Sequence, residues 1–263
     1  VQAHHSEDML TRLRQVIDPE KVDYIVVNHV ELDHAGALAE FVRVCKPAKI
    51  FCSTMGLKSM AGYFNTEGWP LEAVKTGDVV NIGSRNIHFV ETRMLHWPDS
   101  MLSEIPEDKR LISNDAFGQN VAASSRFADE VPRADLERAI EEYYYNIVLP
   151  CSPQVLKTLE LAGELKLDID MIAPDHGFIF RGKEDVAYIL EKYRALAEQK
   201  TAKRALIFYD TMWHSTEKLA YYIGCGLESV GVPYRIMFLK NHHHSEIQTE
   251  LARCGAVVAG SPT

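Results

Sequence analysis

The residues most suited to chemistry lie in the run His29-Val30-Glu31-Leu32-Asp33-His34. This run follows directly on the apolar segment 24–27, which is typical of a buried strand. Four ionisable side chains crowded beside an apolar strand desolvate and repel one another unless a cation neutralises them. Imidazole and carboxylate groups are metal ligands, and this short loop carries enough of them to contact two ions. The run therefore predicts a metal site.

Three further candidate ligands follow predicted strands later in the chain. They are His96 in Leu-His-Trp-Pro, Asp115 in Ser-Asn-Asp-Ala-Phe-Gly and His176 in Ala-Pro-Asp-His-Gly. A lone histidine or aspartate at a strand end is usually a cap or turn residue, and for His96 alone that structural role is favoured. Together with the run at 29–34, however, the three complete a dinuclear site with one carboxylate left to bridge the ions. A zinc hydrolase of similar layout would be expected to have histidine at the position of Glu31. A carboxylate there makes the site harder and more anionic, which suits iron or manganese better than zinc.

The elements that must position these residues alternate between strands and helices, which predicts an α/β fold. Candidate ligands follow predicted strands at 21–27, 111–113 and 171–173. The segment 73–91 is expected to form short antiparallel strands, with turns near residues 77 and 83. Another strand is expected at 50–53, and helices are expected at 35–44, 56–64, 133–149, 152–165 and 183–199.

The character of the sequence changes at 197–204, which is polar and charged. We place a domain boundary near residue 200, which divides the chain into residues 1–200 and 201–263. The second part begins a doubly wound parallel sheet of βαβαβ type. Its strands are expected at 205–209, 234–239 and 256–260, with helices at 216–230 and 245–253. A sheet of three strands is too small to be complete, so we expect the chain to be part of a longer protein.

A second chemical feature is the hydroxyl-rich loop that follows the strand 205–209. Its sequence fits neither the dinucleotide-binding glycine pattern nor the phosphate loop of nucleoside triphosphatases. Thr211, Ser215 and Thr216 can donate to a phosphate, together with the first N–H groups of the following helix. A single hydroxyl here would be an N-cap, but three of them favour a phosphate site. A second loop, Gly260-Ser261-Pro262-Thr263, should lie beside the first at the carboxyl edge of the sheet.

Composition excludes several classes of protein. The net charge of −9 and the lack of a basic run argue against nucleic acid as a partner. No apolar stretch approaches the roughly 20 residues of a membrane helix, and the first residues lack the apolar core of a signal peptide. The five cysteines are widely spread and form no C-x-x-C pair, which favours free, mostly buried thiols in a reducing compartment. We therefore expect a cytoplasmic protein without a membrane segment.

With these two features together, the chain resembles the flavodiiron proteins, also called A-type flavoproteins. The resemblance covers essentially the whole chain. It implies a metallo-β-lactamase-like αββα domain at residues 1–200, lacking its N-terminal strands. It also implies a truncated, flavodoxin-like FMN-binding domain at 201–263. The motifs that carry it are 28–34, 95–100, 113–118, 173–177, 209–217 and 260–263. Leu32 departs from the family, since many relatives have proline there.

The resemblance also implies a role for each candidate residue. One iron would be held by His29, Glu31 and His96. The second would be held by Asp33, His34 and His176, with Asp115 bridging the pair. The residues implied for FMN are Thr211, Met212, Trp213, His214, Ser215, Thr216, Ser261, Pro262 and Thr263.

By the same resemblance, the protein would be an oxidoreductase that reduces dioxygen to water or nitric oxide to nitrous oxide. Its cofactors would be two non-haem irons and FMN, and its electron donor a rubredoxin, a reduced deazaflavin or a similar carrier. A head-to-tail homodimer, or a dimer of such dimers, would bring flavin and iron together. The ligand set serves both gases, so the choice between them stays open. One alternative is a dinuclear zinc hydrolase of metallo-β-lactamase type fused to an electron-transfer flavodoxin module. Another is an electron-transfer module without catalysis.

Overall fold

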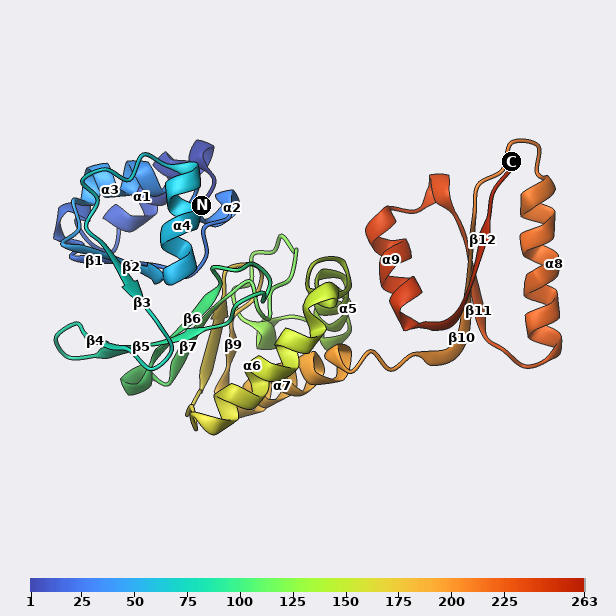
Figure 1. Cartoon of the computed structure of the whole chain (residues 1–263). Helices are drawn as coiled ribbons and strands as arrows, with labels where there is room; N and C mark the ends of the chain where they lie inside the picture. Colours follow the sequence, from blue (N-terminus) through green and yellow to red (C-terminus); the bar gives the residue numbers. More distant parts are fainter. Residues whose placement is uncertain (263) are drawn as a thin grey trace.

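The computed structural model describes residues 1–262 and arranges their strands in three β-sheets (Figure 1). The first sheet is parallel and has the order β1–β2–β3. Its strands are β1 (Tyr24–Val27), β2 (Lys49–Ser53) and β3 (Leu71–Val74). The helices around it are α1 (Ser6–Arg14), α2 (Leu32–Ala35), α3 (Leu38–Cys45) and α4 (Thr54–Tyr63).

Strand β2 shows how the layers of the first part are built. Ile50 and Cys52 are buried on one face of β2, where they pack with Met60 of α4. Phe51 points to the opposite face and packs against Phe89 of the second sheet, with ring centroids 6.0 Å apart. Because side chains alternate along a strand, one strand contributes to both the helix–sheet core and the sheet–sheet core. The result is two sheets face to face with helices outside.

The second sheet has six strands in the order β4–β5–β6–β7–β8–β9. Most neighbours are antiparallel, but β7 and β8 run parallel. Helices α5 (Arg133–Tyr143), α6 (Ser152–Glu164) and α7 (Gly182–Ala197) share the largest hydrophobic core with it. The strands are β4 (Val79–Asn81), β5 (Asn86–Glu91), β6 (Met101–Ile105), β7 (Arg110–Asn114), β8 (Met171–Pro174) and β9 (Phe180–Arg181).

The third sheet is parallel and has the order β11–β10–β12. Helices α8 and α9 cover its opposite faces, as Figure 1 shows. Leu206 of β10 packs on the α9 side, and its neighbour Ile207 packs on the α8 side. The bounds are β10 (Ala202–Tyr209), α8 (Ser215–Ser229), β11 (Tyr234–Phe238), α9 (His244–Arg253) and β12 (Cys254–Gly260).

The boundary proposed near residue 200 lies between α7 and β10. Helix α9 nevertheless contacts the first part of the chain. The side-chain amide of Asn146 donates to the carbonyl oxygen of Ser245 over 3.1 Å, and the Ser245 hydroxyl donates to Glu142 over 2.8 Å. The division into two domains at residue 200 therefore stays a prediction.

Several elements differ from what the sequence predicts. The segment 73–91 is not antiparallel throughout, because β3 pairs parallel with β2. The helix expected over 133–149 ends as an α-helix at Tyr143 and continues as a π-helical turn, Tyr144–Val148. Strand β6 was not predicted. Within residues 1–262, no helix is long and apolar enough to cross a membrane. The five cysteines are free, and three of them are buried, as expected.

Candidate metal centre

The candidate centre is built from loops that leave four strands of the first two sheets. His29 lies just after β1, His96 lies in the loop between β5 and β6, and Asp115 and His176 follow β7 and β8. Glu31 lies directly before helix α2, whose single turn carries Asp33 and His34. Gly36 keeps this turn tight, because a Cβ there would lie 2.4 Å from the carbonyl oxygen of Leu32.

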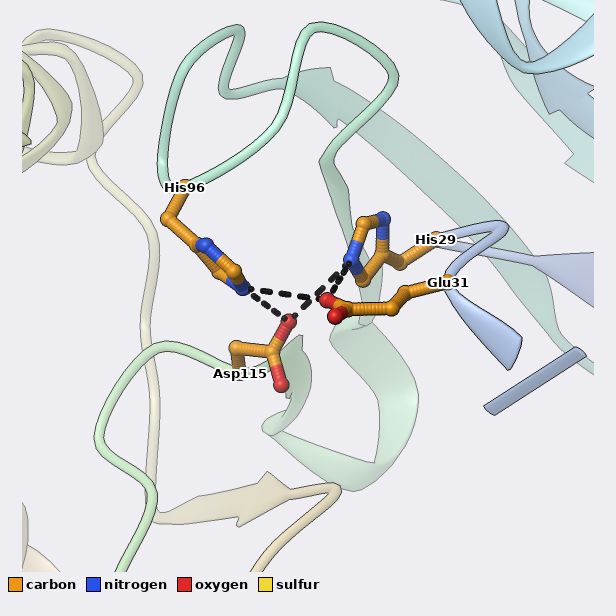
Figure 2. Close-up of side chains that lie close together, drawn as sticks. All are labelled: His29, Glu31, His96 and Asp115. Atoms are coloured by element: carbon orange, nitrogen blue, oxygen red, sulfur yellow. Dashed lines mark hydrogen bonds and ion pairs between the residues drawn. The ribbon is translucent and has the colours of Figure 1, made fainter. Parts of the chain in front are cut away.

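The first group of donor atoms comes from His29, Glu31, His96 and Asp115, whose side chains point toward one another in Figure 2. Nε2 of His29 lies 3.2 Å from Glu31 Oε2 and 3.5 Å from Asp115 Oδ2. Nε2 of His96 lies 3.5 Å and 3.3 Å from the same two oxygens. Two imidazoles and two carboxylates thus surround one point, with donor atoms all within 4.8 Å of one another.

The second group comes from Asp33, His34 and His176. Nε2 of His176 lies 3.3 Å from Asp33 Oδ2 and 3.2 Å from Asp115 Oδ1. Nε2 of His34 lies 3.0 Å from Asp115 Oδ1 and 3.4 Å from Asp33 Oδ1. Asp115 therefore faces the first group with Oδ2 and the second group with Oδ1, which is the geometry of a bridging carboxylate.

The charges of the group are strongly coupled. Burial would lower the pKa of His34, but hydrogen bonds of its ring to Asp115 and Asp175 raise that pKa to about 10. Burial would likewise raise the pKa of Asp115, yet hydrogen bonds from histidine rings, that of His176 foremost, hold the pKa well below its usual range. Without metal ions, protons on the imidazoles supply the positive charge that the buried carboxylate needs.

The residues fit a pair of metal ions. Asp33 Oδ1 and Asp115 Oδ2 are buried and have no hydrogen-bond partner among residues 1–262. Imidazole nitrogens lie 3.3–3.5 Å from these oxygens without forming a hydrogen bond, and one ion in each group would give each oxygen a direct contact. The donors are imidazole nitrogens and carboxylate oxygens, a set that suits iron or manganese.

All seven residues predicted as ligands are therefore brought together. Three neighbours that the sequence did not single out complete the surroundings. Tyr143 is the last residue of α5, and its hydroxyl donates to Asp115 Oδ1 over 3.2 Å. Asp99 and Asp175 contact the outer ring nitrogens of two histidines. Both aspartates lie in the sequence motifs around His96 and His176. Their closeness in sequence to these predicted ligands is the one feature that could have pointed to them.

The loop at His176 depends on a glycine. Gly177 has a φ of +82°, and a Cβ there would lie 2.4 Å from Gln119 Oε1. The same Gln119 oxygen accepts a hydrogen bond from the Phe178 N–H over 2.7 Å. The buried Gln119 therefore holds the backbone that follows His176. Only glycine at position 177 leaves room for the Gln119 side chain.

The second predicted feature, the phosphate loop, lies at the carboxyl edge of the third sheet. Tyr209 pairs with Gly260, and the Asp210 N–H donates to the Gly260 carbonyl over 3.0 Å, so the two predicted loops are adjacent. Thr211 is buried, and its hydroxyl oxygen has no hydrogen-bond partner among the described residues. An unpartnered hydroxyl beside the start of the 15-residue helix α8 is suited to binding an anion.

The other residues predicted for flavin binding are placed in different ways. Met212 and Trp213 are exposed. His214 adopts φ +62° before α8, and its Nδ1 lies 2.5 Å from Glu217 Oε2. Thr216 is buried, with its methyl group toward Gly260. Ser215 is the first residue of α8, Ser261 and Pro262 are exposed, and Thr263 lies outside the described residues.

Comparison with known proteins decides the family. The model of a family described as "ODP family beta lactamase" matches residues 2–177, which is more than half of the chain. The chain is 48% identical to the rubredoxin-oxygen oxidoreductase of Megalodesulfovibrio gigas over 263 residues, which is all of this chain and 65% of that protein. It belongs to the flavodiiron protein family.

Two further relatives show how far the likeness extends. The nitric oxide reductase of Moorella thermoacetica is 39% identical over 257 residues, which is 98% of this chain and 64% of that protein. The crystal structure of the flavodiiron protein from Giardia intestinalis superposes with a TM-score of 0.94 at 29% identity, over 100% of this chain and 64% of that one. The chain thus spans slightly less than two thirds of the length of these relatives. The predicted α/β fold with a metallo-β-lactamase-like part is confirmed.

Proposed function

We propose that the protein is a flavodiiron oxidoreductase that reduces dioxygen to water or nitric oxide to nitrous oxide. The observation that carries the proposal is the position of Asp115, whose two oxygens face two separate groups of metal-ligating side chains. A dinuclear centre needs such a bridge, whereas a structural ion-pair network does not. The names of the relatives, an oxygen oxidoreductase and a nitric oxide reductase, support the same reaction class.

In this proposal His29, Glu31 and His96 hold one iron. Asp33, His34 and His176 hold the other, and Asp115 lies between them. When bound, two ferrous ions and a reduced flavin supply the four electrons that reduction of dioxygen to water requires. The task of the chain is to fix the ligands so that coordination positions between the ions stay open.

Tyr143 adds a proton-bearing group beside this centre. Burial raises the pKa of its hydroxyl, so the oxygen keeps its proton. The hydroxyl donates a hydrogen bond to Asp115 Oδ1. The hydroxyl therefore lowers the negative charge felt at one side of the bridging carboxylate without neutralising it. The Tyr143 hydroxyl therefore stays protonated throughout the neutral pH range.

FMN would bind at the two adjacent loops of the third sheet, within a flavodoxin-like domain at residues 201–263. The unpartnered hydroxyl of Thr211 and the first N–H groups of α8 would bind its phosphate. In Figure 1, α8 lies at the right edge, and α9 and the third sheet separate it from α2, so one copy does not bring the two cofactors together. A head-to-tail dimer would solve this, and we propose a rubredoxin-type carrier or a reduced deazaflavin as electron donor.

The test is anaerobic reduction of the purified protein, followed by separate additions of dioxygen and nitric oxide with product measured. We expect about two irons and one flavin per chain, and consumption of at least one gas. Recovery of two zinc ions with hydrolase activity and no gas consumption would instead support the hydrolase alternative. Gas-independent flavin reduction with an iron-free centre would support an electron-transfer module.

A further inference from the structure

Two histidines of the candidate centre are contacted on their outer ring nitrogen by a carboxylate that belongs to neither group of ligands. His29 Nδ1 lies 3.0 Å from Asp99 Oδ2, and His34 Nδ1 lies 3.1 Å from Asp175 Oδ2. In both rings the other nitrogen, Nε2, faces the proposed metal positions. One such pair therefore belongs to each half of the centre.

The chemistry of the pairs sets the state of the rings. An ionised carboxylate only accepts hydrogen bonds, so the imidazole nitrogen that faces it must carry a proton. A neutral ring with its proton on Nδ1 presents a lone pair at Nε2, which is the form that binds a metal. A carboxylate behind a ligating histidine both orients the ring and makes it a stronger donor to the metal.

Asp99 is fixed from several directions. Its side chain and that of His29 are fully buried. Asp99 Oδ2 also accepts the N–H of Val30 over 2.8 Å, and its carbonyl oxygen accepts the hydroxyl of Ser53 over 2.7 Å. Ser53 in turn caps helix α4 by accepting the Gly56 N–H over 2.9 Å. Ser53 thus holds the backbone of Asp99, and the Val30 N–H holds its Oδ2 against His29.

Asp175 is held less tightly. Its N–H donates to the Asn114 carbonyl over 2.9 Å, which joins it to the strand that leads to Asp115. About a third of its side chain is exposed, however, and water can compete for its oxygens. The carboxylate behind His34 is therefore partly solvated, whereas the carboxylate behind His29 is buried.

We propose that Asp99 and Asp175 are positioning residues that fix His29 and His34 as Nε2 ligands, and that Asp99 secures its half of the centre more tightly. The inference rests on the proposed diiron function and adds two residues to it. It predicts that the half supported by Asp175 releases its metal first.

The test titrates metal-free protein with ferrous iron in the absence of oxygen and measures release to a chelator. Asp99→Leu should weaken one iron site by about 10–100-fold, and Asp175→Leu should weaken the other by a similar factor. Asp99→Asn and Asp175→Asn keep an oxygen that accepts the Nδ1 proton, so they should restore part of the affinity. They also keep the test valid if a leucine variant fails to fold.

A spectroscopic measurement separates positioning from general stability. In protein loaded with zinc, which is diamagnetic, nitrogen-15 NMR should place protons on Nδ1 of His29 and His34. Asp99→Leu should shift or remove the His29 signal alone. The matched control is Glu104→Gln, because Glu104 is buried and lies 3.2 Å from Nδ1 of His88, a histidine in neither group of ligands. It should leave both irons and both signals unchanged.

The outcomes distinguish the two levels of the argument. If wild-type protein binds no iron, the proposed function itself is wrong. If wild-type protein binds two irons but the Asp99 and Asp175 variants match it in affinity and in nitrogen-15 signals, only the positioning inference is overturned. Equal iron loss in Glu104→Gln would also overturn it.

Discussion

The hydroxyl of Tyr143 donates a hydrogen bond to Asp115 Oδ1 over 3.2 Å, at the residue where α5 gives way to a π-helical turn. The ring of Tyr143 lies against Gly118, where a Cβ would come within 3.0 Å of the ring carbon Cζ. The backbone next to Asp115 and the ring that donates to it are therefore fitted to each other. The end of α5 and the loop after β7 position the bridging carboxylate together.

Removal of the Tyr143 hydroxyl should lower the stability of the protein without changing its fold. In Tyr143→Phe, Asp115 loses one hydrogen bond to a charged group, so the free energy of unfolding of metal-free protein should fall by about 1.5–3 kcal/mol. Urea denaturation measures the change. Tyr188→Phe is the matched control, because the buried Tyr188 hydroxyl has no partner among residues 1–262 and its loss should cost nothing. Equal destabilisation by both variants would contradict the proposed role of the hydrogen bond.

Asp115→Asn should remove more metal than any change of a terminal ligand. The substitution keeps the size of the side chain but removes the charge that faces both groups of ligands. We expect loss of both irons, whereas His176→Asn should lose no more than one. Metal analysis of the two purified variants makes the comparison, and equal iron retention would argue against a bridge.

The metal-free protein should lose stability as the pH rises. His34 has a pKa of about 10 in the folded chain, above its ordinary value of 6.5. A raised pKa stabilises the folded state fully below about pH 6.5, and this contribution is lost as the pH rises toward 10. The pKa values of His29 and His176 are shifted in the same direction, while Asp115 loses its contribution only in acid. Thermal unfolding with a chelator present should show the decline, and His34→Asn should flatten it.

Thr211→Val should separate flavin binding from stability. The Thr211 hydroxyl is buried without a partner, so replacing it by a methyl group should leave flavin-free protein as stable or stabilise it. FMN affinity should fall, because a phosphate loses one donor. Changing Thr211, Ser215 and Thr216 together to Ala should release flavin and leave iron in place. Unchanged FMN affinity in the triple variant would rule out this loop as the phosphate site.

Mixing variants tests the head-to-tail dimer. An Asp115→Ala protein lacks the metal centre, and the triple Ala variant lacks the flavin. If electrons cross between subunits, mixed dimers should regain part of the oxygen or nitric oxide consumption. Mixed dimers that form and remain inactive would show that electrons travel within one chain.

The metal ligands could be predicted because four of them lie within six consecutive residues. The acids and histidines of residues 29–34 crowd one loop, and no ordinary structural role explains so many together. Strand β6 was hidden because Ser103 and Glu104 are polar although both are buried, so the stretch lacks a hydrophobic signal. Glu104 tolerates burial through its contact with His88 on the neighbouring strand, a pairing that depends on the register of the sheet.

Roles that depend on packing between distant segments were beyond the sequence. Tyr143 lies in a run of three tyrosines, which suggests core packing, and only the docking of α5 on the sheet brings its hydroxyl to Asp115. Asp99 and Asp175 were visible within their motifs. Their contacts to His29 and His34 became apparent only once the loops were placed.

The loops of the candidate centre have a mechanical consequence. His29 and His34 leave the first sheet, whereas His96, Asp115 and His176 leave the second. Metal ions held between them would act as cross-links between the two halves of the sandwich and would close long loops of the chain. A chain whose sheets have not yet docked offers no complete set of donors, so ion capture would come late in folding and would lock the sheets together.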